Sequence, residues 1–141
     1  MPDLAVRVRR LFDAGRHKTI ATVRADGGPR ISGIECEFSD GHLRFGSMRG
    51  ARKAADLRRD PRFDLHGPTS HPVVGREHEW PGEAKISGLA EIVTDPDGSV
   101  DADMFIARMT TVTVTSLDET ASVLVVEWWT PADGLQRVER G

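Results

Sequence analysis

Apolar residues recur along the chain with two different periods, which predict one helix followed mainly by strands. The first period is helical and covers residues 3–14, so this segment predicts an amphipathic helix that ends before Gly15. Its apolar positions are Leu4, Val8, Leu11 and Phe12. The next segments are short, rich in β-branched residues and separated by turns of Asp and Gly, which predicts a three-stranded antiparallel meander. These strands are residues 17–23, 30–38 and 42–46.

The middle of the chain predicts further strands around a loop. Residues 63–66 and 83–94 are expected to be strands, and residues 67–82 between them, with three prolines and three glycines, an ordered loop. The turn residues of 95–98 close the second of these strands. Residues 100–109 predict a helix.

The last third of the chain predicts two more strands and then an irregular tail. Residues 111–117 are rich in β-branched side chains, and residues 123–129 are almost continuously apolar, which is typical of a central strand buried on both faces. The polar tail, residues 130–141, contains Pro131 and Gly134, which we expect to interrupt any regular element.

Six or seven strands with three short helices predict one domain over residues 1–141, mainly β with short helices (α+β), folded as a small antiparallel barrel. Because residues 123–129 are apolar on both faces of the strand, we expect one face to meet a second subunit in a homodimer.

Positive charge gathers where a helix is predicted to begin, in the stretch that ends at Pro61. The first turn of a helix is already the positive end of its dipole and has unpartnered N–H groups, so further cations there cost stability. A phosphate monoester would offset that cost if backbone amides, the Ser47 hydroxyl and the basic side chains bound it. The alternative is a solvated helix in an Arg-rich protein, and both interpretations stay open. The three cations are Arg49, Arg52 and Lys53.

Composition excludes several classes of protein. Apolar residues make up 38% and charged residues 29% of the chain, which predicts a folded domain rather than a disordered one. The net charge of −3 argues against a dedicated nucleic-acid or membrane-surface protein. Residues 44–62 nevertheless hold seven basic residues against two acidic ones, which favours a small anionic ligand. With a single cysteine, no apolar run of membrane length and no signal-peptide core, we expect a cytoplasmic protein.

Histidines and carboxylates gather in or beside the loop, but their spacing matches no metal-ligand signature, so we expect no metal site. One of these histidines could act as a general acid, because histidine titrates near neutrality. The residues are His66, His71, His78, Glu77 and Glu79.

The remaining reactive and aromatic side chains fit ordinary packing. Cys36 lies in a predicted strand and reads as a buried thiol rather than a nucleophile. No Gly-x-Ser-x-Gly elbow is present to support a hydrolase. Trp128 predicts core or dimer-interface packing, whereas Trp129 and Trp80 are candidates to wall a cleft, where an indole stacks on a planar ring.

Four segments of the chain occur in an order that resembles a known family. They are TIATVRADGGPRIS at 19–32, DGHLRFGS at 40–47, GARKA at 50–54 followed by DPR at 60–62, and GEAKISGLAEIV at 82–93. Together they resemble the pyridoxamine 5′-phosphate oxidase-like, or split-barrel flavin-binding, superfamily, and the resemblance covers about residues 15–130.

The resemblance implies a split β-barrel homodimer that holds a flavin or deazaflavin in each of two clefts at the subunit interface, next to a small-molecule substrate. The Arg-Lys pair that holds the cofactor phosphate in such proteins corresponds to Arg52 and Lys53, and Ser47 matches the hydroxyl residue at the strand end. The second strand would run along the cofactor ring. Its candidate neighbours of the ring are Arg30, Ile31, Ser32 and Gly33.

The chain also departs from the family pattern. Ala51 stands where a serine often precedes the Arg-Lys pair, so one phosphate contact is lost or moved. Ile34-Glu35-Cys36 replaces the basic second strand of true pyridoxamine phosphate oxidases, and Leu135-Gln136-Arg137 replaces their substrate clamp. Because the chain has no tyrosine to hold a substrate phosphate, we do not expect vitamin B6 oxidation.

These inferences predict an oxidoreductase, dependent on FMN or a deazaflavin, that transfers hydride between the bound cofactor and a small organic substrate; no residue stands out as catalytic. FMN comes first because its single phosphate matches one compact basic cluster. Coenzyme F-420 is the second candidate. Its longer acidic tail would need more cations, which Arg49, Arg58 and Arg59 could supply. The alternative is a non-catalytic protein that carries or senses flavin or haem. Nucleic-acid binding through residues 44–62 is disfavoured by the net charge.

Overall fold

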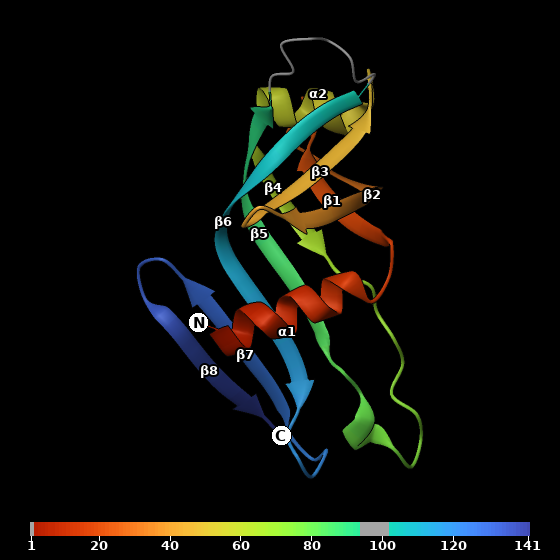
Figure 1. The fold of residues 1–141 in the computed structure, drawn as a ribbon, viewed down its shortest axis with the longest axis vertical. Helices are drawn as coiled ribbons and strands as arrows, with labels where there is room; N and C mark the ends of the chain where they lie inside the picture. Colours follow the sequence, from red (N-terminus) through yellow and green to blue (C-terminus); the bar gives the residue numbers. More distant parts are fainter. Residues whose placement is uncertain (1, 94–101) are drawn as a thin grey trace.

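A twisted antiparallel sheet closes into a barrel, and the chain continues from it into a separate hairpin (Figure 1). The computed structural model describes residues 2–93 and 102–141, and this part of the chain contains eight strands and two α-helices. The helices are α1 (Pro2–Asp13) and α2 (Arg52–Arg59). The strands are β1 (His17–Val23), β2 (Pro29–Ser39), β3 (His42–Met48), β4 (Arg62–His66), β5 (Glu83–Val93), β6 (Ala102–Leu117), β7 (Leu124–Thr130) and β8 (Gly134–Arg140).

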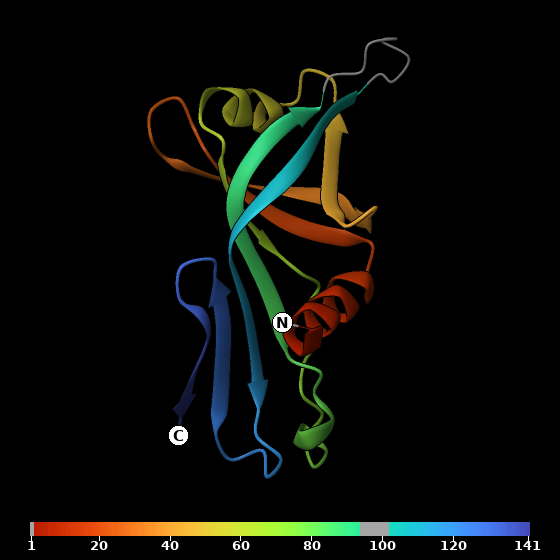
Figure 2. The ribbon, with the colours of Figure 1, turned by 60° about the vertical axis from the view of Figure 1, so that its left-hand side comes forward.

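The long strand β6 both closes the barrel and splits from it. Its first part pairs with β3, from Met48↔Ala102 to Arg44↔Ile106, which joins the two ends of the order β3-β2-β1-β4-β5-β6. Its last part pairs instead with β7, and β8 follows at the edge. The predicted antiparallel barrel is therefore confirmed as a closed six-stranded barrel, with the β7–β8 hairpin extending beyond it (Figure 2).

A β-bulge interrupts the pairing of β5 with β6 where the barrel gives way to the hairpin. Ser87 pairs with Thr111 but Gly88 pairs with Met109, so Thr110 has no partner across the ladder. The Thr110 hydroxyl donates to the Ser87 carbonyl at 3.2 Å. Such a bulge increases the local twist and lets a strand change direction.

The core fills the barrel and continues under α1. The Phe45 ring lies 5.3 Å from the Phe63 ring and 5.7 Å from the Phe105 ring, measured between centroids. The apolar stripe predicted for residues 3–14 is buried as expected, and α1 packs it against β5 and β6. At the other end of the barrel α2 lies across the strands (Figure 1).

The helix predicted for residues 100–109 is wrong in the part that the structure describes, because residues 102–109 belong to β6. Phe105 and Ala107 are buried on the barrel side of the strand, and hydrogen-bonded pairing with both β3 and β5 outweighs the local spacing of apolar residues. The turn predicted for residues 95–98 lies outside the described residues.

The C-terminal predictions also need correction. Residues 134–140 of the tail form strand β8, and Pro131 and Gly134 fall in or beside the tight turn that joins it to β7 rather than breaking an element. Strand β7 is central in pairing, but in the single chain only its Val125 is buried. The reason is that the β7–β8 hairpin extends beyond the barrel, where α1 contacts β7 only in part, through Trp129 and an ion pair between Arg7 and Glu127.

Candidate functional site

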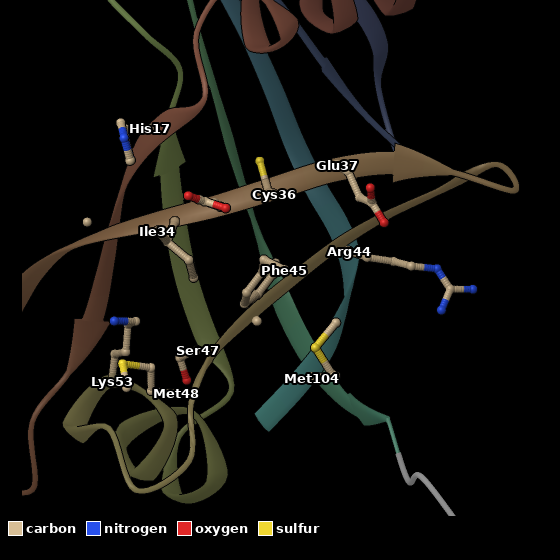
Figure 3. A pocket seen from close by; sticks show the side chains of 13 residues that line it. His17, Ile34, Cys36, Glu37, Arg44, Phe45, Ser47, Met48, Lys53 and Met104 are labelled. Atoms are coloured by element: carbon tan, nitrogen blue, oxygen red, sulfur yellow. The ribbon is translucent and has the colours of Figure 1, made fainter. Parts of the chain in front are cut away.

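A cavity of about 540 Å³ opens on the outer face of β2 and β3, next to the start of α2 (Figure 3). Residues of β2 and β3 form its floor, Met104 of β6 lies at one side, and Lys53 of α2 lies at one end. His17 lines it from the start of β1. The cavity thus draws on four consecutive elements, β1, β2, β3 and α2, and on the distant strand β6.

The floor of this cavity includes an outward-facing glycine on each strand, beside the side chains of Glu35, Glu37 and Arg44. Gly33 lines the cavity, and a side chain added there would meet no atom within 4 Å. Gly46 follows the core residue Phe45, so it faces the opposite side of β3, and an added Cβ would meet the Met104 sulfur at 2.6 Å. The open backbone at Gly33, in a cavity that the Met48 and Met104 thioethers also line, suits a planar ring.

One end of the cavity presents groups that suit an anion. The Ser47 Oγ is buried and has no hydrogen-bond partner within residues 2–93 and 102–141. Lys53 lines the same cavity, and neither it nor Arg52 forms an ion pair with any residue that the structure describes. An unpaired buried hydroxyl and an uncompensated ammonium are both costly in the protein alone and favourable toward a bound anion.

Helix α2 begins as the charge pattern predicted. It starts at Arg52, has no acidic residue in its first turn, and its N-cap residue Ala51 makes no side-chain capping bond. The preceding turn is held by an Ala51 N–H bond to the Met48 carbonyl at 3.1 Å. The first amides of α2 are therefore left without a side-chain acceptor from the cap.

A buried carboxylate, Asp56, joins α2 to the barrel and was not predicted from the sequence. The Thr22 hydroxyl and the Arg30 Nε donate to its Oδ2 at 2.8 and 2.7 Å, and an Arg59 nitrogen donates to its Oδ1 at 3.0 Å. Burial alone would disfavour the charge, but the hydrogen bonds from Arg30, Thr22 and Arg59 hold the pKa of Asp56 below its ordinary value. Arg30 was expected beside the cofactor ring, but its Nε donates a hydrogen bond to the Asp56 carboxylate instead.

The turn before α2 is tied to β6. Asp103 accepts a hydrogen bond from Arg58, and one from the Gly50 N–H at 3.4 Å. The sequence suggested Arg58 and Arg59 as partners of a long acidic cofactor tail. In the structure Arg58 forms an ion pair with Asp103, and Arg59 forms one with Asp56. Arg49 lies exposed in the same turn.

The predicted binding residues divide into two groups. Gly33, Ser47 and Lys53 line the cavity together. Arg30, Ile31, Ser32, Arg49, Arg52 and Trp129 do not line it. Ile31 is 76% exposed on β2, and Trp129 lines a separate cavity of about 220 Å³ against α1.

Sequence reasoning missed several cavity residues, although strand alternation could have found two of them. Arg44 and Gly46 flank the core residue Phe45, so both must face outward. The Arg44 Nε is buried without a hydrogen-bond partner in the described part of the chain. Met104 could not be found this way, because its segment was predicted to be a helix.

Cys36, a half-buried free thiol, lines the cavity. Burial raises the pKa of its side chain to about 11, with a smaller opposing effect of Lys18. The sequence predicted a buried thiol rather than a nucleophile; the side chain is half-buried, and its raised pKa disfavours the reactive thiolate. Within the described residues, no three His, Cys, Asp or Glu side chains gather in a way that could hold a metal ion. None of the described helices has the length and apolar character that crossing a membrane requires.

The closed six-stranded barrel, with a cavity on its outer face and a helix start at one end, defines a split-barrel protein. The chain belongs to the pyridoxamine 5′-phosphate oxidase family, whose model matches residues 7–127. This match confirms the resemblance drawn from the sequence motifs. No curated protein matches the chain at a significant level.

Solved structures with the same fold carry different descriptions. A pyridoxamine 5′-phosphate oxidase-related, FMN-binding protein from Nostoc punctiforme is 11% identical, with a TM-score of 0.65 over 99% of this chain and 94% of its own. An F-420 reductase is 20% identical, with a TM-score of 0.57 over 74% and 94%. A haem-binding protein from Mycobacterium smegmatis is 13% identical, with a TM-score of 0.61 over 100% and 89%. At these identities the likeness shows the fold alone.

Proposed function

We propose that the cavity binds the phosphate-bearing tail and planar ring of a flavin-type cofactor, and that the protein is a flavin- or deazaflavin-dependent oxidoreductase. The observation that carries the proposal is that, among the described residues, the buried Ser47 hydroxyl has no hydrogen-bond partner and Lys53, in the same cavity, forms no ion pair. The open backbone at Gly33 lies in the same cavity and leaves room for a ring, whereas Met104 covers Gly46. The residues present therefore fit such a group.

In this proposal the residues of the chain bind the cofactor and orient its ring. Lys53, the Ser47 hydroxyl and the first amides of α2 hold the phosphate, while the glycine floor, Met48 and Met104 confine the ring. When bound, a flavin or deazaflavin supplies hydride transfer, so the protein needs no acid or base of its own for that step. We therefore assign no catalytic residue.

FMN fits the charges better than a deazaflavin with a long acidic tail. Arg58 and Arg59, two of the three cations suggested for such a tail, are already bound to Asp103 and Asp56. Lys53 and Ser47 remain as one compact site, which matches a single phosphate monoester. Coenzyme F-420 is the second candidate, supported by the fold shared with an F-420 reductase.

A second copy of the chain would complete the cavity. The floor faces outward from the barrel, and among the described residues no atom lies within 4 Å of a Cβ built at Gly33. We propose the homodimer expected from the sequence, with Trp129 of β7 as a candidate to wall the partner's cavity.

The second candidate function is a carrier or sensor of flavin or haem. His17 lines the cavity and could ligate haem iron, and the fold is shared with a haem-binding protein over the whole chain. Cys36 is a poor alternative ligand, because burial raises the pKa of its thiol to about 11. Turnover of the bound cofactor with a nicotinamide or deazaflavin donor separates the enzyme from the carrier.

The test is titration of the protein with FMN, coenzyme F-420 and haem, followed by absorption spectra, for the wild type and for Lys53→Ala. The variant should bind FMN more weakly by about 1.5–3 kcal/mol, about 10–150-fold. Its stability without ligand should be unchanged or slightly higher, because a cation at a helix start has been removed. Lys85→Ala, an exposed lysine of β5, is the matched control and should bind like the wild type. Equal affinity of both variants, or no binding by the wild type, would overturn the proposal.

A further inference from the structure

Helix α2 has little of its own to fix it on the barrel. It is eight residues long, its N-cap makes no side-chain bond, and its buried apolar residues are Ala54 and Leu57 alone. Isolated helices of this length are unstable in water. The third buried residue of α2 is Asp56, which is only 3% exposed, so a charge occupies a position where packing would normally supply an apolar side chain.

The Asp56 carboxylate connects α2 to two strands at once. Its Oδ2 accepts from Thr22 of β1 and from Arg30 of β2, at 2.8 and 2.7 Å. Arg59, one turn further along α2, donates to the Asp56 Oδ1 at 3.0 Å and to the Val23 carbonyl of β1 at 2.6 Å. Charge-assisted bonds of this kind fix geometry as well as energy.

These bonds also decide what Lys53 can do. Lys53 and Asp56 are three residues apart, so they lie on the same side of α2 and would ordinarily attract each other. The Asp56 oxygens are instead occupied by Thr22, Arg30 and Arg59, and no ion pair joins Asp56 to Lys53 in the described part of the chain. The Lys53 ammonium therefore stays available to the cavity (Figure 3).

We propose that Asp56 is a positioning residue: held by Thr22 and Arg30, it sets the rotation of α2 that directs Lys53 and the first helix amides toward Ser47. This inference rests on the proposed phosphate-binding function of that end of the cavity. It assigns to Arg30 a part in fixing the helix rather than in touching the cofactor ring.

The sign of the effect separates positioning from simple electrostatics. Asp56 is an anion one helical turn from Lys53, so charge alone predicts that its removal strengthens binding of a phosphate. Positioning predicts the opposite, because a loosened helix no longer holds Lys53 at Ser47. A purely structural role predicts that every ligand of the cavity is affected equally.

The experiment compares FMN with riboflavin, which lacks only the phosphate, by fluorescence titration of wild type and Asp56→Asn. The ratio of the riboflavin Kd to the FMN Kd measures the contribution of the phosphate. We expect Asp56→Asn to reduce this ratio about tenfold or more, with the riboflavin Kd within about twofold of wild type. The matched control is Asp60→Asn, the same change on a carboxylate that pairs with its close neighbour Arg62 and not with Thr22, Arg30 or Arg59, and it should leave the ratio unchanged.

Each outcome decides a question. An unchanged or increased ratio in Asp56→Asn overturns the positioning role, and equal weakening of both ligands assigns Asp56 a structural role only. If Asp56→Asn does not fold, Thr22→Val removes a single donor and should still reduce the ratio, and an unchanged ratio there overturns the proposal. A wild-type ratio near one contradicts the proposed phosphate site itself, and a high wild-type ratio that Asp56→Asn leaves intact contradicts this inference alone.

Discussion

Ser47 shows at the scale of one residue how a binding site is costly to the protein without its ligand. Its hydroxyl is buried with no partner in the described part of the chain, and such a group costs about 1–3 kcal/mol. A ligand phosphate would accept its hydrogen bond. Binding and stability should therefore respond to its removal in opposite directions.

We accordingly expect Ser47→Ala to leave the unliganded protein as stable as wild type or up to about 1 kcal/mol more stable, and to weaken FMN binding about 5–10-fold. Urea unfolding and FMN titration measure the two effects. Riboflavin binding is the control and should not change. A clear loss of stability without ligand would show that the hydroxyl has a structural partner instead.

Cys36 gives a second prediction at the same scale, from its pKa of about 11. The thiolate is the reacting form, so alkylation by iodoacetamide should be slow at pH 7–8 and should accelerate as the pH approaches 11. Because Cys36 lines the cavity, saturating FMN should slow the reaction further. Mass spectrometry over a pH series measures both. Fast alkylation at pH 7, or no protection by FMN, would contradict the placement of this thiol.

At the scale of elements, the bulge between β5 and β6 and the bare floor of β2 depend on glycine for different reasons. A Cβ at Gly88 would lie 2.3 Å from the Arg108 carbonyl oxygen, which is backbone and cannot move aside without shifting β6. A Cβ at Gly33 would meet nothing. The fold therefore leaves no space for a side chain at Gly88, whereas it leaves space for one at Gly33.

Gly88→Ala should therefore destabilise the protein by roughly 2–4 kcal/mol, because the two strands must separate locally. Gly33→Ala should leave the unliganded stability close to wild type and should instead weaken binding of FMN and riboflavin alike, since it fills the floor under the ring. Thermal unfolding and titration distinguish the two variants. A stable Gly88→Ala protein would mean that the bulge does not require the close approach.

At the scale of the whole molecule, the hairpin of β7 and β8 and the outward-facing cavity both leave apolar surface uncovered. Only Val125 of β7 is buried, and Ile31 and Met48, on the strands that carry the cavity, are 76% and 83% exposed. A second copy that covered this surface would bury it and would close the cavity from the open side.

We expect sedimentation equilibrium at micromolar concentration to give about twice the 15.5 kDa of one chain, with one cofactor bound per chain. Ile31→Glu should dissociate the dimer and weaken cofactor binding without unfolding the barrel. Val74→Glu is the control, because Val74 is 93% exposed in the loop at the far end of the molecule from α2 (Figure 2). A wild-type monomer that binds FMN tightly would rule out a shared site.

The local pattern of the sequence determined much of this protein. The amphipathic spacing of residues 3–14, the β-branched strands with their Gly-containing turns, and the cations at the start of α2 all act within a few residues, so each could be read in order. The family motifs likewise come from contiguous segments. For the same reason the cavity-lining residues Ser47 and Lys53 were found beforehand.

The tertiary structure alone decided which distant segments meet. Residues 102–109 are a strand because β3 and β5 offer hydrogen-bonding partners on both sides, and residues 134–140 are a strand because β7 does. Asp56 reads as a surface charge on a short helix, and only the fold brings Thr22 and Arg30 to its oxygens. Long-range pairing and burial carry more free energy than local propensity, and no short window of sequence contains them.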